Sequence, residues 1–208
     1  MPRVILCLIT SACLLIPAGC FNIGSNARPA NTYFMLNPVT APKTALQSGS
    51  AGQAVVIGVG PVELATYLNR PNIMIRINRN ELRAADFARW AEPLTDNFSR
   101  TLAENISILA PENRIIMFPW NRTQRTDYQI SVNVIRFDGT FGDNVTLISR
   151  WTLSEKNGEN ILLSRQSTFS EPLPDRNYAV IVSALSRTLE SLSREIAVEI
   201  KSQMTDNK

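Results

Sequence analysis

Apolar residues recur at helical spacing in two stretches of the chain. The first stripe, at steps of four, four, four and three, comprises Leu94, Phe98, Leu102, Ile106 and Leu109. This spacing is typical of an amphipathic helix, and Pro93 suits its first turn because a missing amide hydrogen costs nothing there. A second stripe, at steps of three and four, runs from Tyr178 to Ile200. We therefore predict helices over about residues 93–109 and 175–204.

Alternating apolar and polar positions predict strands in much of the remaining chain. The clearest alternation covers residues 128–134, and the same period continues across 143–155. Ile73, Ile75 and Ile77 alternate with Met74 and Arg76, which predicts a strand with these isoleucines on its buried face. Other β-prone runs lie at residues 32–36, 54–62, 115–118 and 161–169, with a hairpin turn predicted at 157–158. We predict one α+β domain over residues 32–208, with a mostly antiparallel or mixed sheet and two main helices packed on it.

The first twenty residues have the order of a bacterial export signal. A positive charge at Arg3 precedes an apolar run over residues 4–16 and the small-residue segment Pro17-Ala18-Gly19. The run is too short to cross a bilayer, which needs about 20 apolar residues in a helix. Residues 1–19 are therefore predicted to be a removed signal peptide.

Cys20 follows this segment directly, and the arrangement resembles a lipobox, the site at which bacterial lipoproteins are cleaved and acylated. Pro17 departs from the usual lipobox residue, and plain release by a signal peptidase is the alternative. With lipidation at Cys20, residues 20–31 form the lipidated N-terminus and a tether. The ten residues from Phe21 to Ala30 reach at most about 33 Å. Phe21, rather than Asp, after the cysteine favours outer-membrane sorting.

Composition excludes several classes of function. The chain has 21 basic and 18 acidic residues, a balance that does not predict nucleic-acid binding. It has no histidine, which removes histidine-dependent nucleophilic catalysis and the commonest transition-metal ligand. Two of the three cysteines leave with the signal, so no disulfide is expected and we predict no metal or other cofactor. The carboxylate pairs Glu92/Asp96 and Asp138/Asp143 remain open to hydrolytic chemistry, but no other feature marks a cleft and a non-enzymatic role is predicted.

Several short motifs resemble those of one family. They are Tyr33…Leu36, Tyr67-Leu68-Asn69-Arg70-Pro71, Arg89-Trp90-Ala91-Glu92-Pro93-Leu94, Pro119-Trp120, Arg136-Phe137-Asp138-Gly139, Leu147…Trp151 and Leu192-Ser193-Arg194-Glu195-Ile196-Ala197. In this order they resemble the ABC-type transport auxiliary lipoproteins of the paraquat-inducible protein C kind. Asn69 departs from the pattern, since Asp is frequent in the family at that position.

The resemblance implies a non-enzymatic, periplasm-facing accessory of an MCE/ABC-type phospholipid transport system. Its implied partners are an MCE-domain protein and the associated membrane transporter. The resemblance also implies an outer-membrane location through the N-terminal lipid, and assembly into a homo-oligomeric ring. The alternative is an outer-membrane biogenesis lipoprotein that binds lipopolysaccharide, lipid or a β-barrel partner on a sheet face.

The candidate partner-binding residues are the distinctive members of these motifs: Tyr67, Arg70, Arg89, Trp90, Pro93 and Trp120. The five arginines at positions 70, 76, 79, 83 and 89 either engage acidic groups or lipid phosphates, or hold the fold through local hydrogen bonds. Trp90 and Trp151 are expected in the core, whereas Trp120, beside a proline in a loop, suits either core or interface. Asn-X-Ser/Thr triplets at Asn97 and Asn105 are attributed to chance.

Overall fold

The computed structural model describes residues 30–40, 54–121, 123–155 and 158–206 of the chain. Its elements, in order, are β1 (Thr32–Phe34), β2 (Val56–Leu64), the 3₁₀ helix η1 (Thr66–Leu68), β3 (Asn72–Arg76), β4 (Leu82–Trp90), α1 (Leu94–Leu109), β5 (Arg114–Met117), β6 (Tyr128–Gly139), β7 (Asp143–Glu155), β8 (Asn160–Leu173) and α2 (Tyr178–Asp206). An eight-stranded mixed sheet and two helices confirm the predicted α+β class. The predicted signal peptide, Cys20 and nearly all of the tether lie outside the described residues.

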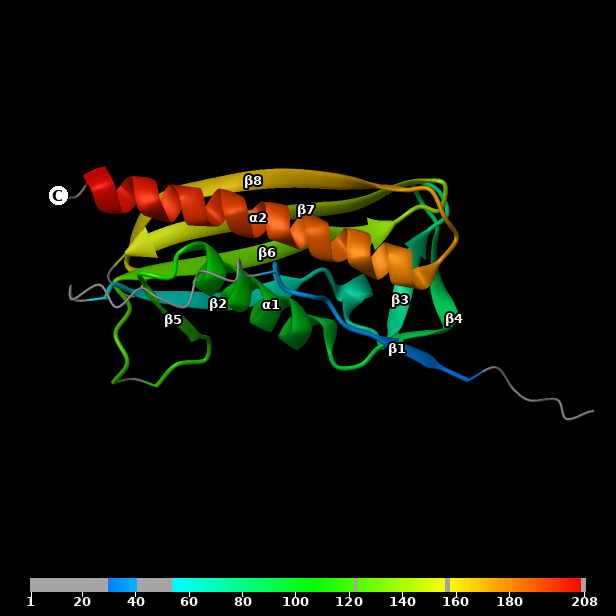
Figure 1. Ribbon diagram of the computed structural model, residues 1–208, viewed down its shortest axis with the longest axis horizontal. Helices are drawn as coiled ribbons and strands as arrows, with labels where there is room; N and C mark the ends of the chain where they lie inside the picture. The colour runs from blue at the N-terminus through cyan, green and yellow to red at the C-terminus, as the bar shows by residue number, and fades with distance from the viewer. Residues whose placement is uncertain (1–29, 41–53, 122, 156–157, 207–208) are drawn as a thin grey trace, which may run out of the picture.

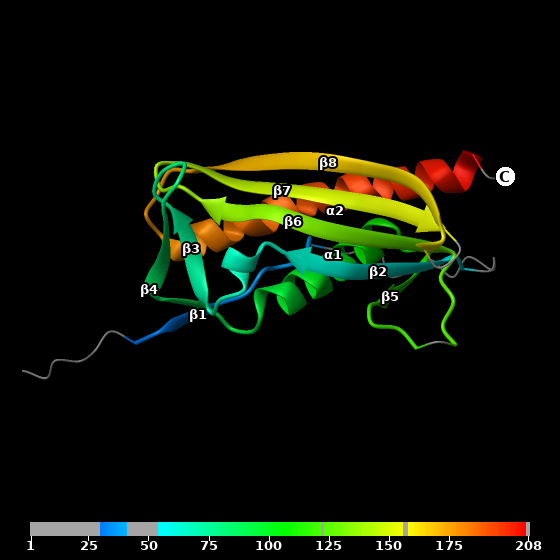
Figure 2. The ribbon, with the colours of Figure 1, turned by 180° about the vertical axis from the view of Figure 1, so that it is seen from behind.

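The sheet is organised around β6 (Figures 1 and 2). On one side, β7 pairs antiparallel along β6 and β8 pairs antiparallel with β7. On the other side, the first half of β6 pairs parallel with β2, which also pairs with β5. The end of β6 meets β3 in parallel, through Gly139 and Ile75, and β3 leads on to β4 and β1. Beside β6 the sheet therefore divides into two branches that lie at opposite ends of the molecule.

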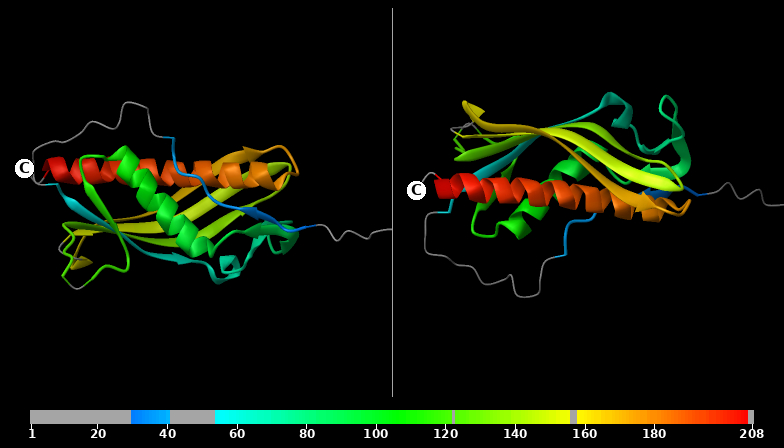
Figure 3. Two further views of the ribbon diagram at one scale, coloured as in Figure 1. Left: turned by 60° about the horizontal axis from the view of Figure 1, so that its bottom comes forward. Right: turned by 90° about the horizontal axis from the view of Figure 1, so that it is seen from above.

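Both helices cover the same face of the sheet (Figures 1 and 2), and the axis of α1 runs obliquely to that of α2 (Figure 3). The predicted α1 stripe is buried at Leu94, Phe98, Leu102 and Ile106, while Leu109 is half-buried. The α2 stripe is buried from Val182 to Ile200, and only Tyr178 at its start is half-buried. These side chains join those of β6 and β7 in one hydrophobic core, which stabilises the two-layer arrangement.

Trp151 lies at the centre of this core, as expected, with no exposed surface. Its indole Nε1 donates hydrogen bonds to Ser167 Oγ at 3.1 Å and to Glu195 Oε1 at 3.2 Å. The polar end of a buried tryptophan is thus satisfied, and β7, β8 and α2 are connected through it.

The face of the sheet away from the helices is polar. In adjacent strands, Ser131 lies opposite Thr152, and Thr152 opposite Ser164. In the next row, Arg150 lies opposite Gln166 and donates a 3.3 Å hydrogen bond to its side-chain oxygen. A face of short polar side chains does not favour the alternative in which lipid is held against the sheet.

The strand β4 is not predicted from the sequence, and the structure shows why. Between the pairs Met74–Ala84 and Asn72–Arg89, β3 advances two residues and β4 advances five. The resulting bulge interrupts the alternation on which strand prediction depends. The side-chain amide of Asn72 donates a 2.7 Å hydrogen bond to the carbonyl of Ala85 within the bulge.

The predicted pattern of the preceding strand is partly wrong. Ile73, Met74 and Ile75 are all buried, whereas Ile77 lies beyond β3 and is 40% exposed. Covering on both faces explains the continuous burial. The predicted hairpin between β7 and β8 is confirmed by the pairing of Glu155 with Asn160 and by a positive φ of 92° at Gly158.

Candidate functional site

A buried carboxylate joins two of the sequence motifs. Asp138, in β6, has no exposed surface, and its two oxygens accept hydrogen bonds from three side chains. Arg76 Nε and Nη2 donate at 2.9 and 2.8 Å, and Arg136 Nε donates at 2.9 Å. The Tyr67 hydroxyl, from η1, donates at 2.7 Å. We call Tyr67, Arg76, Arg136 and Asp138 the polar cluster.

Charge and hydrogen bonding in the polar cluster displace the pKa values of its members. Burial alone would raise the pKa of Asp138, but hydrogen bonds from Arg76 and Tyr67 and the charge of Arg136 outweigh it and hold the pKa below its ordinary value. Burial, together with the hydrogen bond to Asp138 and its negative charge, raises the pKa of Tyr67 well above the ordinary value. Asp138 is thus ionised and Tyr67 neutral at pH 7.

This arrangement shows how two residues of the sequence analysis are bound. The oxygens of Asp138 are occupied by two guanidinium groups and a phenol, which does not favour a hydrolytic pair with Asp143. Arg76, from the arginine-rich segment, forms a partly buried ion pair with Asp138 and so holds the fold together locally. The polar cluster ties η1, β3 and β6 together and fixes the position of the chain that follows Tyr67.

That chain forms one wall of a hollow of about 340 Å³. Asn69, Arg70 and Pro71 line one side, and Trp90, Ala91, Glu92, Pro93 and Leu94 line the other. We call it the motif hollow, because all of its lining residues come from the two motifs at residues 67–71 and 89–94. Three of the candidate residues, Arg70, Trp90 and Pro93, are brought together here.

Backbone hydrogen bonds hold the two walls of the motif hollow in place. The amide of Trp90 donates to the carbonyl of Pro71 at 2.7 Å, and that of Ala91 donates to Phe34 at 2.9 Å. Trp90 itself is 5% exposed and packs in the core, as predicted. Glu92 forms an ion pair with Arg100 of α1.

Pro93, the predicted first residue of the helix, stands one position before the observed start. It is the N-cap of α1, which begins at Leu94. Its carbonyl accepts hydrogen bonds from the amides of Asp96 and Asn97 at 3.0 and 3.1 Å. The proline ring is exposed, so it is available at the rim of the motif hollow.

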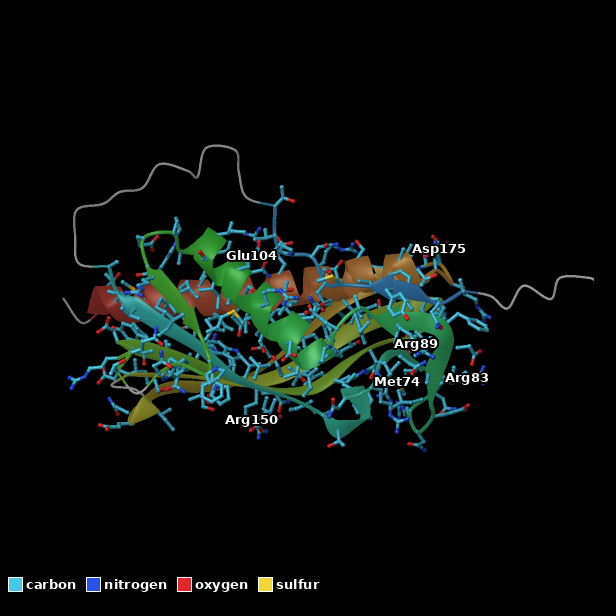
Figure 4. The ribbon with its side chains drawn as sticks, turned by 90° about the horizontal axis from the view of Figure 1, so that it is seen from below. Met74, Arg83, Arg89, Glu104, Arg150 and Asp175 are labelled. Carbon is cyan, nitrogen blue, oxygen red and sulfur yellow. The ribbon has the colours of Figure 1, made fainter. Side chains whose placement is uncertain are left out.

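Besides Tyr67 of the polar cluster, two candidate residues lie outside the motif hollow. Arg89 lies in β4 opposite Tyr33 of β1, at the end of the molecule formed by β3 and β4 (Figure 4). Trp120 lies in the loop between β5 and β6, and β5 is at the opposite end of the molecule (Figure 1). Trp120 packs so closely over Gly58 that a Cβ there would lie 2.9 Å from its ring. Its ring contacts Phe118 edge-on at a centroid distance of 5.3 Å.

Two asparagines with important contacts are not identified from the sequence. Asn97 Oδ1 accepts a 2.7 Å hydrogen bond from the amide of Leu36. Asn105 Oδ1 accepts one from Val39, also at 2.7 Å, and its amide donates to Ser193 Oγ at 3.0 Å. Both side chains are buried and attach the segment after β1 to the helices. An Asn facing the core of a predicted helix is the signal that could have revealed them.

Within the described residues, no group of three or more acidic, cysteine or histidine side chains could hold a metal ion. In the same part of the chain, no helix is long and apolar enough to span a membrane.

The model of a family described as the ABC-type transport auxiliary lipoprotein component matches residues 34–197. The chain belongs to this family. A family of transport auxiliary lipoproteins is not an enzyme class, and the match includes the motif hollow and the polar cluster.

Solved structures share the fold of this family member. One, an uncharacterized protein, is 20% identical with a TM-score of 0.68, and the alignment covers 83% of this chain and 99% of that one. Another, from Xanthomonas campestris, is 19% identical with a TM-score of 0.63 and the same coverage. Among curated proteins, none matches the sequence significantly.

Proposed function

We propose that this auxiliary lipoprotein is a non-enzymatic, periplasm-facing subunit of an MCE/ABC-type phospholipid transport system. In this role it docks the transport assembly at the outer membrane. Its anchor is a lipid on Cys20, and it works as a homo-oligomeric ring together with an MCE-domain protein and the associated membrane transporter. Membership of the auxiliary lipoprotein family supports a role beside a transporter.

The observation that carries the docking proposal is the motif hollow. Its walls come from segments about twenty residues apart in the sequence, yet the polar cluster and backbone hydrogen bonds hold them in register. Such preorganisation favours binding, because less entropy is lost when a partner is captured. The hollow is the proposed contact with the MCE-domain protein.

The lining residues define the chemistry of the partner segment. Arg70 is exposed and has no ion-pair partner among the residues that the structure describes. Pro93, which is exposed, provides apolar surface beside it, and the mostly buried Trp90 lines the hollow from the core side. A segment that presents a carboxylate next to an apolar side chain fits this combination.

The proposal is tested by purifying the tagged chain from cross-linked membranes of its native host and identifying the bound proteins by mass spectrometry. We expect an MCE-domain protein to co-purify with the wild type and with Arg150→Glu, whose exposed side chain lies on the polar sheet face. With Arg70→Glu, much less MCE-domain protein should co-purify. Recovery of a β-barrel protein or lipopolysaccharide in its place would support the alternative function and contradict this one.

A further inference from the structure

A second hollow, separate from the motif hollow, is lined by arginines. Its volume is about 270 Å³, and Arg76, Arg83 and Arg176 line it together with Phe141 and Tyr178. We call it the arginine hollow. It lies between β4 and the start of α2, and among the described residues no carboxylate lines it. Figure 4 shows Arg83 at this end of the molecule, with Asp175, just before Arg176, at the same end.

Two of the three guanidinium groups are available to a ligand. Arg76 is occupied by Asp138 in the polar cluster. Among the described residues, the ion-pair contact of Arg83 is a loose one with Glu81, at 3.7 Å, and both side chains are at least half exposed. Arg176 is exposed and has no ion-pair partner within the described residues. Paired guanidinium groups are well suited to the oxygens of a phosphate.

A wider groove continues from the arginine hollow. It has a volume of about 670 Å³ and shares Arg176 and Tyr178 with that hollow. From there it follows β4 along Asp86, Phe87 and Ala88 to Phe34 of β1. We call it the β4 groove.

The β4 groove combines aromatic and apolar side chains with the polar side chains of Thr32, Asp86, Arg176 and Asn177. Phe87 is 47% exposed, and Tyr178 contacts Phe141 edge-on at a centroid distance of 5.7 Å. A cationic hollow that opens into an aromatic groove matches an amphiphile with an anionic head and an apolar tail. A free phosphate would use only the first of these features.

The position of both cavities relative to the tether favours a membrane lipid. β1 begins at Thr32 and pairs with β4 through Thr32–Ala88 and Phe34–Trp90, so the described chain begins beside the β4 groove (Figures 1 and 3). A lipid on Cys20 would hold this end within about 33 Å of the bilayer, the reach of ten extended residues. Tyr33 and Met35, next to the groove, are 60% and 45% exposed.

We propose that the arginine hollow and the β4 groove together bind one anionic phospholipid, with its phosphate between Arg83 and Arg176 and an acyl chain along Phe87. The inference rests on the proposed function for its membrane orientation, and it identifies the lipid class that the subunit itself handles.

The test uses the chain from residue 20 onward with Cys20→Ser, which retains every described element and has no acyl group. Binding is measured by calorimetry for soluble short-chain phosphatidylglycerol, glycerol phosphate and inorganic phosphate. We expect phosphatidylglycerol to bind most tightly of the three. The double variant Arg83→Gln with Arg176→Gln should bind it about tenfold or more weakly. Phe87→Ser should weaken the binding of the lipid but not the binding of glycerol phosphate.

The matched control is Arg125→Gln with Arg150→Gln, which removes the same charge from exposed positions outside both cavities. This control variant should bind short-chain phosphatidylglycerol as tightly as the wild type does. Equal loss in both double variants, or inorganic phosphate binding as tightly as the lipid, would overturn the inference. Because the assay contains no partner protein, its failure leaves the co-purification result intact, and failed co-purification leaves lipid binding intact.

Discussion

The hydroxyl of Tyr67 donates a 2.7 Å hydrogen bond to Oδ2 of Asp138, a carboxylate with no exposed surface. These residues lie in different motifs, at 67–71 and 136–139, and the bond joins them. Arg76 and Arg136 complete the polar cluster around the same carboxylate. The cluster therefore positions Arg70 at the motif hollow.

Tyr67→Phe should lower the free energy of unfolding by about 1.5–3 kcal/mol, because a hydrogen bond to a buried charge is lost. Urea denaturation followed by circular dichroism measures the change. Tyr33→Phe is the matched control, since its side chain is 60% exposed, and it should change stability by less than about 0.5 kcal/mol. Equal effects of the two variants would show that the Tyr67–Asp138 bond does not stabilise the fold.

Asp138→Asn should be more damaging. It should lower the free energy of unfolding by about 3 kcal/mol, because it leaves two partly buried guanidinium groups without their counter-charge. Asp143→Asn, on an exposed carboxylate of the next strand, should have little effect in the same denaturation experiment. A stability of Asp138→Asn close to that of the wild type would mean that the ion pairs are dispensable.

The same carboxylate gives stability a defined dependence on pH. Its pKa is held below the ordinary value in the folded state, so its ionised form stabilises folding. That contribution is complete above about pH 5, begins to fall near the ordinary aspartate pKa of about 4, and is lost once the pH passes the folded pKa. The stability gap between wild type and Asp138→Asn should therefore shrink on acidification. A gap that stays constant down to about pH 2 would contradict this linkage.

Asn105→Ala should lower the free energy of unfolding by about 2–3 kcal/mol, since the part-buried amide of Val39 loses its acceptor and the buried Ser193 loses a donor. Hydrogen exchange should rise selectively at the amide of Val39, while Leu36 keeps its bond to Asn97. Ser107→Ala, at an exposed position of the same helix, serves as the control. Unchanged exchange at Val39 would show that the side chain does not hold this segment.

Gly58→Ala should displace Trp120, because the added Cβ would lie 2.7 Å from Thr126 and 2.9 Å from the indole. Overpacking of this kind costs about 1–3 kcal/mol. The displaced indole should shift the tryptophan fluorescence to longer wavelength, while Trp90 and Trp151 stay buried. An unshifted spectrum with native stability would contradict the close packing.

Local periodicity was sufficient to predict much of the fold. The stripes through Leu102 and Leu189 predicted both helices to within a few residues, because a single buried face repeats over many turns. The bulge in β4 was not predictable, since extra residues opposite Ile73 break the alternation. Ile77 was misassigned because β3 ends at Arg76, one residue earlier.

The candidate site was predicted in part. The motifs at 67–71 and 89–94 are recognisable in the amino-acid sequence, but only the fold shows that they line one hollow. From the sequence, the pair Asp138/Asp143 stays open as a hydrolytic alternative, because partners distant in sequence, such as Arg76, cannot be read from spacing. Asn97 and Asn105 were seen only as accidental triplets, since their partners also lie far along the chain.

Photo-cross-linking in the native host tests the docking claim most directly. A photoreactive residue at position 70 should form a covalent adduct with the MCE-domain protein, because Arg70 lines the motif hollow. The same residue at position 150, on the polar sheet face, should form little or none. Absence of the adduct at position 70, or equal adducts at both positions, would contradict docking through the motif hollow.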